Sequence, residues 1–137
     1  MGGKVCAHQD STFLWTDPPT TIGLWFALED ASVENGCLYG IPGSHRFNVA
    51  QRNILTSDKK STEFRPQTPP NWDLSKMIPL EMNEGSVVVF DGAFVHMSYD
   101  NKSSKSRHAL TLHAMDAETS TWSSENWLQR STPFRPY

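Results

Sequence analysis

The sequence has few cysteines and no pattern among them. Cys6 and Cys37 are the only two in 137 residues, and they do not form a Cys-x-x-Cys spacing. So small a number excludes a disulfide framework. Each cysteine lies in an apolar, strand-like segment, so we expect both to be small buried hydrophobic residues of a protein in a reducing compartment.

The sequence also lacks an excess of basic residues and any long apolar run. Lysine and arginine number 12 against 15 aspartates and glutamates, which gives a net charge of −3 and a pI near 5.9. The basic footprint of a nucleic-acid or anionic-membrane binder is therefore missing. No segment is apolar for long enough to span a membrane, and the N-terminus carries no signal-peptide core. We expect an intracellular, cytoplasmic protein whose partner is a small-molecule substrate, not a nucleic acid or a membrane.

A convincing helical period is absent as well. Short apolar segments punctuated by glycine, proline and asparagine occur instead, at residues 5–8, 22–29, 37–41, 78–82, 87–90, 94–98 and 108–114. Such a series predicts an all-β sandwich or barrel. The composition, 37% hydrophobic and 20% charged, is typical of a globular protein, and nothing divides residues 1–137 into more than one domain.

Residues 44–71 interrupt this series. They are polar, charged and rich in proline, which predicts a long irregular loop. A loop of that length inside a compact domain is uncommon unless it is functional or disordered. We consider two interpretations, a loop that faces the substrate and a disordered segment, and the sequence does not choose between them.

The triplet His8-Gln9-Asp10 is the first candidate site. In an extended chain, residues two positions apart project to the same side, so His8 and Asp10 can contact one metal ion. His96, at the end of a distant strand-like run, is the candidate third ligand. Two imidazoles and one carboxylate form the facial triad of non-heme Fe(II) oxygenases. A surface hydrogen bond between two ordinary side chains is the alternative for so short a motif.

Arg107 adds to this pattern. It precedes the strand-like segment 108–114 and follows His96 closely in the chain. An arginine guanidinium binds a carboxylate through two parallel hydrogen bonds, so Arg107 is suited to an organic acid bound near the metal. The alternative is a surface arginine, because its neighbours from Lys102 to Ser106 are polar.

These motifs resemble those of a known family. The segment from Trp25 to His45, with the triad before and after it and Glu125-Asn-Trp-Leu-Gln129 near the end, resembles the phytanoyl-CoA dioxygenase family. The resemblance implies a double-stranded β-helix, also called a jelly roll. It also implies an Fe(II)- and 2-oxoglutarate-dependent dioxygenase, which couples decarboxylation of 2-oxoglutarate to succinate with hydroxylation of a C–H bond by dioxygen. The substrate is unidentified, and an acyl-CoA is suggested by the family name alone.

The resemblance also implies a role for each candidate residue. His8, Asp10 and His96 would be the catalytic metal ligands, and Trp25, Ser98 and Arg107 would contact 2-oxoglutarate. In the family, helices and a first strand precede the point where this chain begins. We therefore expect a partial double-stranded β-helix, truncated at its N-terminal side. The alternatives are an inactive fragment or short isoform that serves as an interaction module, and a metal-binding jelly roll that does not use 2-oxoglutarate.

Strand alternation predicts an uncovered apolar surface. If Trp25 and Arg107 point inward, the opposite faces of their strands carry the apolar residues Leu24, Phe26, Leu28, Leu110, Leu112 and Ala114. The run 87–90 is apolar throughout and is predicted to be buried on both sides. We therefore expect the isolated chain to expose an apolar sheet face, to self-associate through it, and to turn over little or no substrate alone.

Overall fold

The computed structural model describes residues 2–135, which contain eleven β-strands, three short 3-10 turns and no α-helix. The strands are β1 (Val5–His8), β2 (Thr16–Asp17), β3 (Ile22–Ala27), β4 (Leu38–Gly40), β5 (Arg52–Leu55), β6 (Thr62–Arg65), β7 (Ile78–Leu80), β8 (Val87–Asp91), β9 (His96–Ser98), β10 (Ala109–Ala114) and β11 (Thr121–Trp122). The turns are η1 (Asp10–Thr12), η2 (Ser44–Arg46) and η3 (Leu74–Lys76). Within the described range, no helix could cross a membrane. The predicted all-β class is confirmed.

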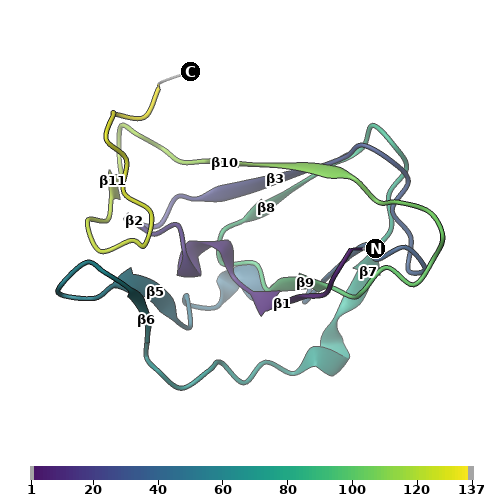
Figure 1. The fold of residues 1–137 in the computed structure, drawn as a ribbon, viewed down its shortest axis with the longest axis horizontal. Helices are drawn as coiled ribbons and strands as arrows, with labels where there is room; N and C mark the ends of the chain where they lie inside the picture. The colour runs from purple at the N-terminus through teal and green to yellow at the C-terminus, as the bar shows by residue number, and fades with distance from the viewer. Residues whose placement is uncertain (1, 136–137) are drawn as a thin grey trace.

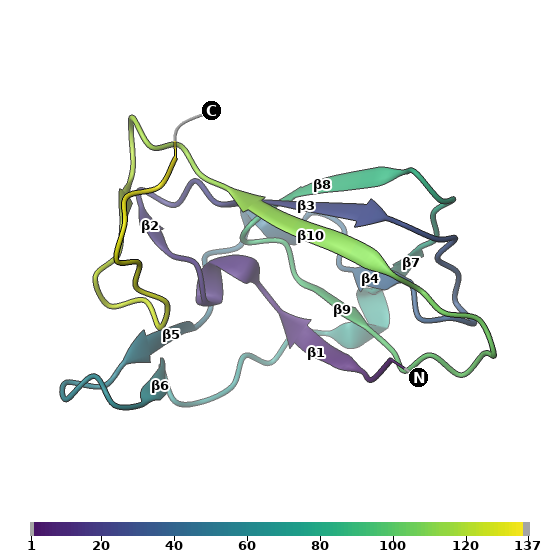
Figure 2. The same ribbon diagram turned by 45° about the horizontal axis from the view of Figure 1, so that its top comes forward.

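Two antiparallel sheets face each other (Figures 1 and 2). One has the strand order β1-β9-β4-β7 and the other the order β10-β3-β8. The chain passes between them repeatedly, because β3, β8 and β10 belong to the second sheet and β4, β7 and β9 to the first. This is the jelly-roll arrangement of the double-stranded β-helix. Two smaller pairs, β2 with β11 and β5 with β6, lie at one end.

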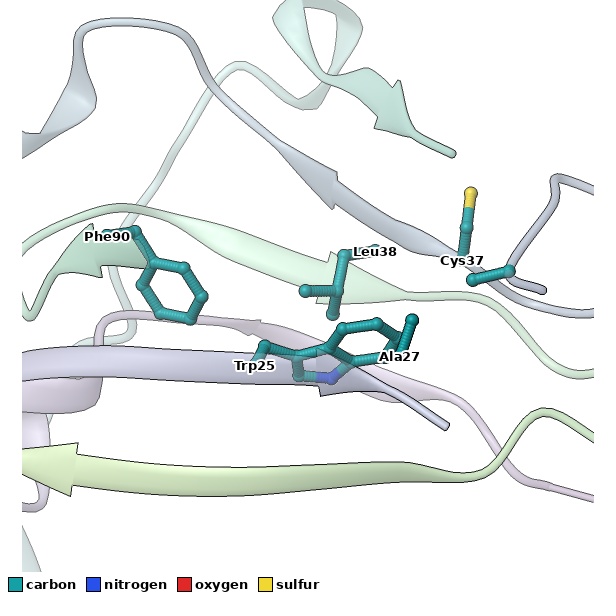
Figure 3. Close-up of a cluster of buried hydrophobic side chains, with 6 residues drawn as sticks. Trp25, Ala27, Cys37, Leu38 and Phe90 are labelled. Atoms are coloured by element: carbon teal, nitrogen blue, oxygen red, sulfur yellow. The ribbon is translucent and has the colours of Figure 1, made fainter. Parts of the chain in front are cut away.

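The core lies between the two large sheets. Trp25 and Ala27 project from β3 toward Leu38 of β4 and the preceding Cys37, and Phe90 of β8 closes the cluster (Figure 3). Burial of a large side chain such as Trp25 stabilises the fold by roughly 1.5–3 kcal/mol. The prediction that Trp25 points inward is therefore confirmed.

The prediction that both cysteines are buried is wrong for one of them. Cys37 is fully buried in the core as expected, but Cys6 is exposed. Both thiols are free. Burial raises the pKa of the Cys37 thiol. Cys6 lies in the exposed first half of β1, where Val5 is also exposed, and it lines a hollow beside His8.

The segment 44–71 is not irregular throughout. Strands β5 and β6 pair antiparallel within it, and Asn53 and Ile54 are buried. The hairpin is held from outside, because Ile54 forms a bridge with Asn126 and the Leu55 amide donates to the Glu125 carbonyl at 2.8 Å. The sequence gives little sign of this, since the stabilising partners lie some seventy residues away in the chain.

The outer face of the β10-β3-β8 sheet is apolar and open. Leu110, Phe26 and Val87 form one cross-strand row, and Leu112, Leu24 and Val89 form the next. Six residues around these rows have between 43% and 58% of their surface exposed: Ile22, Leu28, Val87, Val89, Leu110 and Leu112. The expected exposure of this face is confirmed. The expected burial of residues 87–90 on both sides is wrong, because only Val88 and Phe90 turn inward, and Val87 and Val89 point to the uncovered side.

We expect the 137-residue chain to self-associate through this face. Covering a half-exposed leucine or valine gains on the order of 1 kcal/mol, and several such residues lie side by side. The double variant Leu110→Thr/Leu112→Thr keeps strand propensity but removes apolar surface, so its apparent mass should be lower at equal concentration. Light scattering coupled to size-exclusion chromatography measures this.

The matched control is Leu74→Thr, because Leu74 is exposed to a similar extent, 48%, but lies on η3 away from this sheet. Its apparent mass should equal that of the parent chain. A parent that remains monomeric at every concentration would contradict the expectation.

Candidate metal centre

The pairing of β1 with β9 brings the two predicted histidine ligands together. His8 lies directly opposite His96 in the antiparallel register, with a bulge between Val5 and His8. The two ring centroids are 4.3 Å apart. Two residues separated by 88 positions in the chain thus present their imidazoles to the same space, which the local sequence of neither one specifies.

Gln9 fixes the turn that places Asp10. Its backbone is extended, with φ −115° and ψ 134°, so His8 and Asp10 project to one side and Gln9 to the other. The Gln9 side chain is fully buried. Its Nε2 donates to the Ala93 carbonyl at 2.7 Å, and its Oε1 accepts from the Ala50 amide at 2.8 Å. The residue between the two ligands is therefore anchored to two other segments.

The ligand atoms converge as the triad requires. Asp10 Oδ1 lies 3.4 Å from His8 Nε2 and 3.6 Å from His96 Nε2. Among the described residues, His8, Asp10 and His96 form the group whose potential ligand atoms all lie within 4.8 Å of one another. Two imidazole nitrogens and one carboxylate oxygen grouped in this way suit a divalent transition metal.

Backbone carbonyls set the tautomers of both histidines. His8 Nδ1 donates to the Cys6 carbonyl at 2.8 Å, and His96 Nδ1 donates to the Phe94 carbonyl at 3.0 Å. A carbonyl only accepts, so each Nδ1 carries a proton and each neutral ring leaves Nε2 bare. Metal-binding histidines in proteins are commonly oriented by such a second hydrogen bond.

The electrostatics favour an ionised carboxylate between the imidazoles. Burial opposes the charge of Asp10, but the hydrogen bond from His113 and the neighbouring imidazoles of His8 and His96 outweigh it and hold the pKa of Asp10 well below its usual range. Burial lowers the pKa of His96 despite the nearby Asp10. Burial acts in the same direction on His8, but its contacts with Asp10 and the Cys6 carbonyl raise the pKa of His8 overall.

All six predicted site residues line one cavity of about 310 Å³: His8, Asp10, Trp25, His96, Ser98 and Arg107. The Arg107 guanidinium carbon lies 5.5 Å from the centroid of the Trp25 ring, a cation–π contact that orients the arginine. Arg107 Nε and Ser98 Oγ are buried and have no hydrogen-bond partner within residues 2–135. Two unpaired polar groups beside the triad suit an anionic ligand that accepts hydrogen bonds.

His113 is the site residue that the sequence did not identify. Its Nε2 lies 2.9 Å from Asp10 Oδ2, and its side chain lines the same cavity. The available signal was strand parity, because every second residue of a strand points to the same face. The residues at alternate positions leading into and along β10 all line the cavity: Arg107, Ala109, Thr111 and His113. Parity predicts which way His113 points, but not that it contacts Asp10.

A second hollow lies on the other side of His8. Its volume is about 370 Å³, and it is lined by Val5, Cys6, Ala7, His8, Thr12, Phe13, Gln51, Phe64, Pro70 and Trp72. The rings of Phe13 and Phe64 meet edge to face, with centroids 6.2 Å apart. Four of the lining residues belong to positions 51–72. Three residues of the segment predicted as a loop, Gln51, Phe64 and Pro70, therefore line this hollow beside the candidate metal centre.

Solved structures share this arrangement of strands. SnoK, a non-heme alpha ketoglutarate dependent carbocyclase from nogalamycin biosynthesis, matches with a TM-score of 0.71 and 23% identity over 98% of this chain and 55% of that one. EvdO2 from Micromonospora carbonacea var. aurantiaca, solved in complex with 2-oxoglutarate, matches with a TM-score of 0.66 and 22% identity over 94% of this chain and 53% of that one. These similarities show the fold.

Similarity in sequence is closer. Phytanoyl-CoA dioxygenase 1 of Oryza sativa subsp. japonica is 49% identical over 136 residues, which cover 99% of this chain and 47% of that protein. Phytanoyl-CoA dioxygenase domain-containing protein 1 of Rattus norvegicus is 45% identical over 140 residues, which cover 99% of this chain and 48% of that protein. The chain thus spans about half the length of these relatives. The phytanoyl-CoA dioxygenase family model matches residues 1–109, and the chain belongs to that family.

Proposed function

We propose that this chain forms the metal- and co-substrate-binding core of an Fe(II)- and 2-oxoglutarate-dependent dioxygenase. One observation carries the proposal: the three converging ligand atoms share a cavity with the unpaired polar groups of Ser98 and Arg107. The epimerase SnoN, which has a similar fold, was solved with Fe3+ and alpha ketoglutarate bound. That precedent and the family membership support the assignment.

The triad would hold Fe(II) through His8 Nε2, His96 Nε2 and Asp10 Oδ1. Two neutral ligands and one carboxylate leave the ion with a net positive charge and with coordination positions free. When bound, the iron and 2-oxoglutarate supply the oxidising chemistry, in which dioxygen, 2-oxoglutarate and a C–H bond give succinate, carbon dioxide and an alcohol. The chain contributes a binding site whose ligand orientations are fixed before any ion arrives.

Arg107 and Ser98 would bind and orient 2-oxoglutarate. The guanidinium matches the geometry of a carboxylate, and its contact with Trp25 keeps it from turning away. Ser98 Oγ can donate to an oxygen of the same ligand. Both residues would therefore bind the carboxylate of 2-oxoglutarate that lies farther from the metal. The buried walls around them would keep water out.

The substrate would enter through the hollow beside His8. Most of its lining is apolar or aromatic, and the lining residues include no lysine or arginine. Such a surface favours an apolar part of a substrate and excludes water from the reacting bond. The family name refers to an acyl-CoA, but the phosphates of a CoA group would find no basic partner among these residues.

We expect the protein to bind Fe(II) and 2-oxoglutarate together, which should give a charge-transfer absorption band under anaerobic conditions. His96→Ala removes one of three ligands and should abolish the band. The matched control is His45→Ala, since His45 is exposed on η2 and lies outside the triad. An unchanged band in His96→Ala would show that the triad is assigned wrongly.

Arg107→Ala should weaken 2-oxoglutarate binding while metal affinity is preserved. Loss of hydrogen bonds to a charged group costs about 1.5–3 kcal/mol, which corresponds to roughly a 10- to 100-fold loss of affinity. Titration of the metal-loaded protein with 2-oxoglutarate measures this loss. Arg46→Ala, at an exposed position of η2, is the control and should bind 2-oxoglutarate as the parent does. Equal affinities in Arg107→Ala and the parent would contradict the role of Arg107.

A further inference from the structure

We propose that His113 is a positioning residue that makes Asp10 a ligand through a single oxygen. The inference rests on the proposed metal site and concerns a residue outside the triad. The two oxygens of Asp10 have different surroundings: Oδ1 faces Nε2 of both His8 and His96, and Oδ2 lies 2.9 Å from His113 Nε2. One oxygen is thus directed at the metal position and the other is held away from it.

The hydrogen bond has only one possible direction. An ionised carboxylate accepts and cannot donate, so His113 Nε2 carries the proton and donates it to Oδ2. The Asp10 side chain is 9% exposed, so water offers Oδ2 little compensation. The contact therefore satisfies a buried oxygen that would otherwise have no partner outside the metal site.

The strand register creates the space in which Oδ2 lies. His113 on β10 pairs with Gly23 on β3. A Cβ on Gly23 would come within 2.9 Å of Asp10 Oδ2 and within 2.5 Å of Phe90 Cε2. Any side chain at position 23 would therefore collide with the carboxylate or the ring. A glycine and a hydrogen-bond donor face each other across the two strands, and together they form a slot for Oδ2.

The geometry assigns His113 a supporting contact and not a place as a fourth ligand. Within residues 2–135, the group of mutually close ligand atoms comprises His8, Asp10 and His96 and does not include His113. Without His113, the free Oδ2 could turn toward the ion and occupy a second coordination position. His113 thus strengthens the orientation of the carboxylate and keeps open a position that 2-oxoglutarate needs.

The test compares His113→Leu with His113→Gln. Glutamine can place an amide N–H near the position of Nε2, whereas leucine has a similar size and no donor. Anaerobic Fe(II) titration should show a 10- to 100-fold loss of affinity in His113→Leu, the usual effect of losing a hydrogen bond to a metal ligand, and near-parental affinity in His113→Gln. His108→Leu, at an exposed position next to the same strand, should bind Fe(II) as the parent does.

Further measurements keep the outcomes distinct. Thermal unfolding without metal should be similar in His113→Gln and the parent, and if His113→Leu does not fold, the shorter amide of His113→Asn replaces it. A parent that binds no metal overturns the proposed function and this inference together. If the parent binds Fe(II) but His113→Leu binds it equally well, the positioning role alone is overturned. The same holds for His113→Asn where it replaces His113→Leu. A His113→Gln variant as weak as His113→Leu also overturns it, because the donated hydrogen bond would then not be what matters.

Discussion

The buried charge of Asp10 is the constraint on which the rest of the site depends. An isolated carboxylate is costly to remove from water, and it is retained in a fold only where donors or cations compensate it. Here His113 on β10 donates to one carboxylate oxygen, and His8 on β1 and His96 on β9 face the other, where a bound cation would compensate the charge. Because β1 and β9 belong to one sheet and β10 to the other, the carboxylate links the two sheets. The candidate metal site and the contact between the two sheets therefore depend on the same residue.

The same strand alternation that builds the site also creates the exposed apolar face. On β3 and β10, inward positions carry Trp25, Thr111 and His113, whereas the positions between them carry leucine and phenylalanine. In an antiparallel sheet with one face in water, these outer positions would normally be polar. A shift of one residue in register would exchange the two faces and remove His113 from Asp10. The apolar outer face and the polar inner face are thus fixed by a single pairing of strands.

Local patterns in the sequence predicted what local geometry determines. Alternation placed Trp25 inward, and the His8-x-Asp10 spacing placed two ligands on one side, because both depend on a few consecutive residues. The contact between His113 and Asp10 was missed because it depends on the pairing of β10 with β3 and joins residues 103 positions apart. The β5–β6 hairpin was missed for a similar reason, since residues 125 and 126 help to hold it. The choice of His96 as the distant third ligand, and of Ser98 and Arg107 as its companions, came from the motif order and the family resemblance, which carry long-range information that composition and periodicity lack.

The polar atoms of the cavity divide into two groups, and the division indicates how the site is used. Around the triad, Asp10 Oδ2 and the Nδ1 atoms of His8 and His96 each have a protein partner, which leaves the atoms that point at the metal position. Farther into the cavity, Ser98 Oγ and Arg107 Nε have no partner among the described residues, and an unpaired buried group costs about 1–3 kcal/mol. Such a cost is recovered when a ligand supplies the missing acceptors. The side chains of the triad are thus already oriented before a metal binds. The unpaired donors of Ser98 and Arg107 favour an anion over water or an apolar molecule.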